Sequence, residues 1–87
     1  MKVLGINSIF KEDSSLYYMN HYTANAVIEL ITQKVDLPVN FSVEITPLGT
    51  RNIDVNFNKD DINYPVMPLT KALKTFVDEL SKNGELP

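Results

Sequence analysis

The sequence predicts an α+β domain in which strands and helices follow the order β-α-β-β-α and build a two-layer sandwich. Apolar and polar residues alternate at 39–45 and again at 53–57, as in strands with one buried face. Apolar residues recur at helical spacing at 24–35 and at 69–80. The chain has 87 residues, which fits a single domain over 1–87.

The first expected element is a strand at about 2–10. Leu4 and Ile6 would point to one side of this strand. Val3 and Ile9 would point to the other side. Apolar residues on both sides indicate a strand that is covered or internal. With a free edge, such a strand invites pairing with another chain.

The second expected element is an amphipathic helix, whose apolar positions are clear over 23–35. Extending the helical wheel backward places Leu16 near the apolar side but Asn20 in the middle of it. The helix therefore starts either near Leu16, which we favour, or at a cap between Asn20 and Thr23. Pro38 is expected to end it, because the residue before a proline avoids the helical conformation.

The remaining elements have well-marked boundaries. Strands at about 39–45 and 53–57 flank a turn and are expected to form a β-hairpin. A helix follows at about 68–82, with an unbroken apolar stripe. Gly84 is expected to end this helix in a left-handed conformation, so that Leu86 can fold back onto the stripe.

The predicted order resembles the split βαβ plan of the ferredoxin-like fold without its last strand. Both helices would cover one face of a three-stranded sheet. The first strand would lie beside the third, so that the strands follow the spatial order 2-3-1. One edge of the first strand would then stay unpaired.

Composition narrows the possible functions. The chain has no cysteine, which excludes disulfides, thiolate metal sites and a cysteine nucleophile. Its net charge of −3 disfavours binding to nucleic acid or to an anionic membrane surface. No apolar run is long enough for a signal peptide or a membrane span, so the expected location is the cytoplasm.

The polar segment 58–63 superficially matches a calcium-binding loop. Its carboxylate and amide side chains alternate, but the glycine and the glutamate that such a loop requires are missing. A turn capped by Asn or Asp side chains is the better interpretation. The sequence therefore predicts no metal and no cofactor.

Four residues make up the candidate small-molecule site. His21 is the only histidine, and Tyr17 and Asn25 would be its neighbours on the expected helix. Arg51 is the only arginine. A pocket between the helix start and the hairpin would join an acid–base group to an anion-binding group. No nucleophile or oxyanion-stabilising motif accompanies them, so we favour a structural role for His21.

Four other residues are the candidate interface. Tyr18 and Tyr22, four residues apart, would share the polar side of the expected helix, and tyrosines are frequent in protein interfaces. Val3 and Ile9 would join them from the edge strand.

The expected function is protein–protein contact, as a homo-oligomer and without a catalytic motif. The alternative is a small-molecule binding or catalytic domain that uses His21 and Arg51. An RNA-binding sheet ranks last, because the polar faces of the hairpin strands carry no aromatic side chains.

Overall fold

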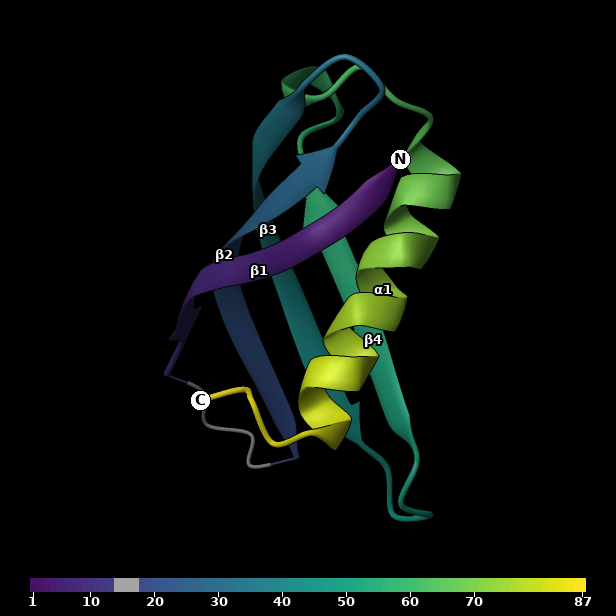
Figure 1. Ribbon diagram of the computed structural model, residues 1–87. Helices are drawn as coiled ribbons and strands as arrows, with labels where there is room; N and C mark the ends of the chain where they lie inside the picture. The colour runs from purple at the N-terminus through teal and green to yellow at the C-terminus, as the bar shows by residue number, and fades with distance from the viewer. Residues whose placement is uncertain (14–17) are drawn as a thin grey trace.

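A computed structural model describes residues 1–13 and 18–87. The described part contains a four-stranded sheet followed by one α-helix (Figure 1). The elements are β1 (Lys2–Lys11), β2 (Met19–Glu29), β3 (Lys34–Ile45), β4 (Arg51–Phe57), the 3-10 helix η1 (Lys59–Asp61) and α1 (Val66–Lys82). Every strand pairs antiparallel with its neighbour in sequence, and the sheet order is β1-β2-β3-β4.

The predicted β-α-β-β-α order, the second helix and the 2-3-1 strand order are therefore wrong. Most of the segment expected to be a helix belongs to β2, which lies between β1 and β3. Tyr22, Ala26 and Ile28 alternate with outward-facing residues and are buried, as in a strand with one covered face. The helical pattern arose by coincidence, because Ile31, which completed it, is 100% exposed.

The turn between β2 and β3 explains why this prediction failed. Leu30 N donates a hydrogen bond to Gln33 O over 2.8 Å, so only Ile31 and Thr32 connect the two strands. Two-residue hairpin turns usually contain glycine or asparagine, and the sequence has neither here. No turn signal was therefore visible where the chain reverses.

Pro38 lies within β3 and does not end a helix. It pairs with Asn25 of β2 on one side. On the other side, the pairing with β4 begins only at Val39, opposite Phe57. The strand is effectively an edge at Pro38, where a missing backbone N–H costs no ladder hydrogen bond.

The C-terminal half of the chain follows the sequence-based expectation. The β3–β4 hairpin and the long helix are confirmed, and α1 begins at Val66. Gly84 has a φ of 67°, and Leu86 packs against the core. At the start of η1, the Asn58 side chain accepts a hydrogen bond from Asp60 N over 3.0 Å, which confirms the predicted cap.

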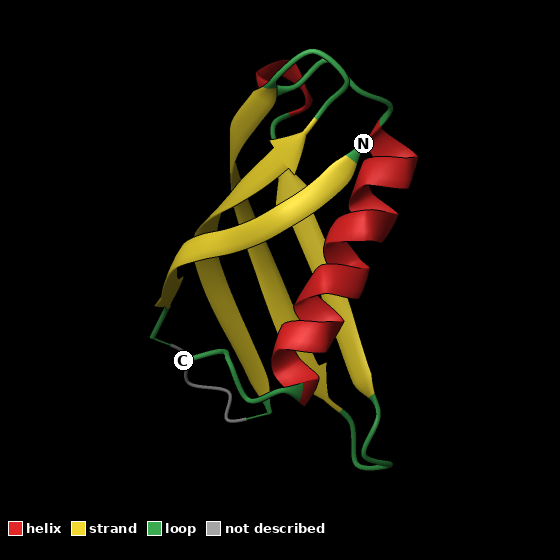
Figure 2. Ribbon diagram, viewed as in Figure 1, coloured by secondary structure: helices red, strands yellow, loops and turns green. Residues whose placement is uncertain are grey.

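The core lies between α1 and one face of the sheet, called here the inner face (Figure 2). The helix contacts both edge strands, β4 and β1. Its buried side chains are Leu69, Leu73 and Val77. The opposite, outer face carries no further layer in the described part of the chain, and amide side chains dominate it. They are Asn7, Asn25, Asn40, Asn52 and Asn56.

Strand β1 curves because its pairing with β2 is irregular. The register shifts between Val3 and Gly5 and again between Asn7 and Phe10. Ser8, in the second shift, has a φ of 52°. Such bulges bend a strand and change which side its residues face. Val3 and Ile9 therefore pack against the core on the same side as Ile6, not on the side opposite to it.

Candidate functional site

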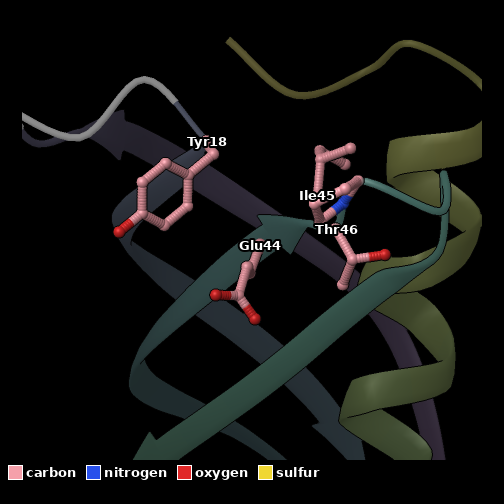
Figure 3. A pocket seen from close by; sticks show the side chains of 5 residues that line it. Tyr18, Glu44, Ile45 and Thr46 are labelled. Carbon is pink, nitrogen blue, oxygen red and sulfur yellow. The ribbon is translucent and has the colours of Figure 1, made fainter.

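A half-open pocket of about 450 Å³ lies at the end of the sheet where β3 passes into the β3–β4 turn. Figure 3 shows the Tyr18 ring on one side, Ile45 and Thr46 on the other, and the Glu44 carboxylate between them. Pro47 also lines it. The Tyr18 side chain is 43% exposed, and Glu44 is half-buried.

Hydrogen bonds hold the walls of this pocket in place. Ile45 N donates to Tyr18 O over 2.9 Å, which joins the start of β2 to the end of β3. Across the turn, the Thr46 and Thr50 hydroxyls are 2.6 Å apart. The pocket is therefore built on paired backbone.

The Glu44 carboxylate is oriented but not neutralised. Asn52 Nδ2 on β4 donates to Glu44 Oε1 over 3.1 Å. Every ion pair found in the described residues lies at α1, and none includes Glu44. The pocket thus combines an aromatic ring, apolar groups and a negative charge held by a neutral amide.

The only arginine is engaged elsewhere. Arg51 Nε lies 3.2 Å from Asp78 Oδ1 on α1, and Lys82 Nζ lies 3.2 Å from Asp78 Oδ2. The hydrogen bonds from Lys82 and then Arg51 hold the pKa of Asp78 below its usual value of 3.8. Arg51 therefore connects the start of β4 to α1 on the inner face.

The predicted ligand residues do not gather in one place. His21 and Asn25 share the outer face, because both alternate with the buried Tyr22 and Ala26. Arg51 lies on the inner face, and Tyr17 is outside the described residues. A ligand role for these residues stays a prediction, but the structure does not bring His21 and Arg51 together.

Asn25 instead takes part in a small polar cluster on the outer face. Its Nδ2 donates to Asn7 Oδ1 over 3.3 Å and to Asp36 Oδ1 over 3.4 Å. These three side chains come from three adjacent strands. They cross-link β1, β2 and β3 at their exposed surface.

The two tyrosines of the predicted interface have different environments. Tyr18 is exposed at the pocket, whereas Tyr22 is only 3% exposed and stacks on Phe41 with ring centroids 5.0 Å apart. Tyr22 Oη donates to Pro87 O over 3.2 Å, and burial raises the pKa of this phenol. The shared helical surface predicted for the tyrosines therefore does not exist, because residue 22 belongs to the core.

Sequence reasoning found Tyr18 but missed the residues that complete the pocket. Glu44 and Ile45 were visible only as alternating strand positions, and Pro47 only as part of a turn. Their proximity to Tyr18 depends on the β2–β3 pairing, which the expected helix concealed. The alternation from Tyr22 to Ile28 was the signal that could have revealed it.

The described part of the chain contains no group of three His, Asp or Glu side chains that could hold a metal ion. Within it, no helix is long and apolar enough to cross a membrane. Comparison with known proteins shows that residues 1–82 match the model of the BB_0187 family. No curated protein and no solved structure matches the chain.

Proposed function

The chain belongs to the BB_0187 family, and we propose that it is a protein-contact domain that pairs with a second copy of itself along the free edge of β4. One observation carries this proposal. In the described sheet, β4 is hydrogen-bonded to β3 on one side and to no strand on the other. An unpaired edge presents backbone N–H and C=O groups that another strand can bind.

Regularity favours β4 over β1 as the pairing strand. The register between β3 and β4 runs without interruption from Arg51 to Phe57. The register of β1 is broken twice, and bulges of this kind protect an edge from pairing. Although Leu4 and Phe10 of β1 are exposed, that strand offers only a short regular segment.

The charge on β4 selects one arrangement of the two copies. A two-fold axis makes the same strand meet itself antiparallel. If the axis passed beside Asp54, the two Asp54 carboxylates would be opposite each other, and like charges destabilise such a pair. With the axis beside Val55, Asp54 lies opposite Asn56 of the second copy, and Ile53 lies opposite Phe57. We therefore propose the register centred on Val55.

This pairing predicts a weak dimer. Seven residues from each copy make an interface at the small end of the known range, which is typical of transient complexes. Analytical ultracentrifugation between roughly 10 µM and 1 mM is expected to show a monomer–dimer equilibrium, with a dissociation constant in this interval.

Substitutions of Asn56 are expected to move this equilibrium in opposite directions. Asn56→Asp would place two carboxylates opposite each other in each of two symmetric pairs and should weaken the dimer. Asn56→Lys would pair with Asp54 and should strengthen it. Each change corresponds to about 0.4–2 kcal/mol for the two pairs together. The measurement is the dissociation constant from sedimentation.

Asn40 provides the matched control. It lies directly opposite Asn56, on the central strand β3, and is exposed on the same outer face. Asn40→Asp and Asn40→Lys make the same change in net charge away from the edge, so they should leave the dimer unchanged. A wild-type protein that stays monomeric at 1 mM, or Asn56 variants that behave like the Asn40 variants, would rule out pairing through β4.

A further inference from the structure

The pocket beside Tyr18 has a composition that the proposed β4 pairing does not use. Its walls are an aromatic ring, the apolar side chains of Ile45 and Pro47, and a carboxylate, that of Glu44. Beyond the pocket, in the same turn, the Leu48 side chain is 91% exposed. An apolar surface therefore continues past the opening.

These groups complement a cation carried on an aliphatic stem. Positive charges are attracted to the face of a tyrosine ring and to a carboxylate. Lysine and arginine side chains bury their methylene stems against apolar surface while the charged end stays near water. The half-buried Glu44 has a neutral hydrogen-bond donor, Asn52, and no ion-pair partner among the described residues.

We propose that this pocket binds a lysine or arginine side chain of a partner protein. The charged end would lie between Glu44 and the Tyr18 ring, and the stem would contact Ile45. The exposed Leu48 favours a polypeptide over a free amine, because it can contact an apolar residue next to the basic one. The net charge of −3 would also attract a basic partner.

The test uses a blocked tetrapeptide of sequence GKLG, titrated into ¹⁵N-labelled protein and followed by NMR. We expect saturable shifts of the backbone amides of Tyr18, Ile45 and Thr46, with a dissociation constant of about 1–20 mM. The same peptide with an acetylated lysine Nε keeps the length and loses the charge, so it should bind about fivefold more weakly.

Two glutamate variants separate the pocket from general charge attraction. Glu44→Gln keeps the side-chain shape and should weaken GKLG binding about fivefold. Glu29→Gln makes the same change at the other end of β2 and should leave the binding unchanged. Glu29 is a suitable control because its strand neighbours are Lys2 and Lys34.

Three results would overturn the pocket. They are the absence of saturable shifts up to about 50 mM peptide, equal binding of the acetylated and unmodified peptides, and equal effects of the two glutamate variants. None of them bears on the β4 dimer, which is measured in the absence of peptide.

Discussion

Replacing Leu73 by alanine is expected to lower the free energy of unfolding by about 2–5 kcal/mol. Leu73 is fully buried at the centre of α1, one turn from both Leu69 and Val77. The substitution removes apolar contacts and leaves a cavity between the helix and the inner face of the sheet. Urea unfolding followed by circular dichroism measures the loss.

The neighbouring Lys74 supplies the control for this measurement. It is exposed on α1, so Lys74→Ala should change the stability by less than about 0.5 kcal/mol. A domain of this size has a total stability of roughly 4–13 kcal/mol. If Leu73→Ala does not fold, Leu73→Val should still fold with a smaller loss. A loss below about 1 kcal/mol for Leu73→Ala would mean that α1 does not cover the sheet as described.

Phe41 is the second position where a large effect is expected. Its side chain is buried on β3 and stacks on Tyr22 of β2. Phe41→Ala should cost about 3–5 kcal/mol, because it removes a large apolar group from the centre of the sheet. Phe41→Leu is the milder variant for which the folded state can be measured if alanine is not tolerated.

A double-mutant cycle makes the Phe41 prediction specific to the strand pairing. We expect Phe41→Leu and Tyr22→Leu to be coupled by about 0.5–1.5 kcal/mol, because the two rings stack directly. Phe41→Leu and Phe76→Leu provide the reference cycle, since no stacking joins Phe76 of α1 to Phe41 in the described residues. Coupling near zero between positions 22 and 41 would show that they are not cross-strand neighbours.

The elements that sequence patterns predicted correctly have local signals that agree with their tertiary surroundings. In α1, the buried Leu69, Leu73 and Val77 fall on one helical stripe, and Gly84 follows as the stop. In the β3–β4 hairpin, the alternating residues are buried on one face only. In these elements, one periodicity was sufficient to identify both the element and its buried side.

Strand β2 could not be identified in this way, because two periodicities fit its residues. Val27 and Ile28 are adjacent, so one of them lies on the outer face of a strand, whereas both fit one side of a helix. Ile31 extended the helical pattern, although it is a fully exposed turn residue. The sheet resolves this ambiguity through long-range pairing with β1 and β3, which no local pattern contains.

The candidate pocket was lost for the same reason. Tyr18 and Ile45 are far apart in sequence and meet only because β2 runs antiparallel to the end of β3. The expected helix directed attention to Tyr22 as a surface residue, but Tyr22 is in the core. Errors about a site therefore followed from an error about one strand.

The central claim is that residues 19–29 form a strand between β1 and β3, since the open sheet and the pocket both depend on it. Nuclear Overhauser effects in the labelled protein test this claim directly. We predict cross-strand effects that join Thr23 to Asn40 and Asn25 to Pro38, with strong sequential Hα–amide effects along β2. Strong amide–amide effects between successive residues from 20 to 31, with contacts between residues three apart, would instead show a helix and contradict the account.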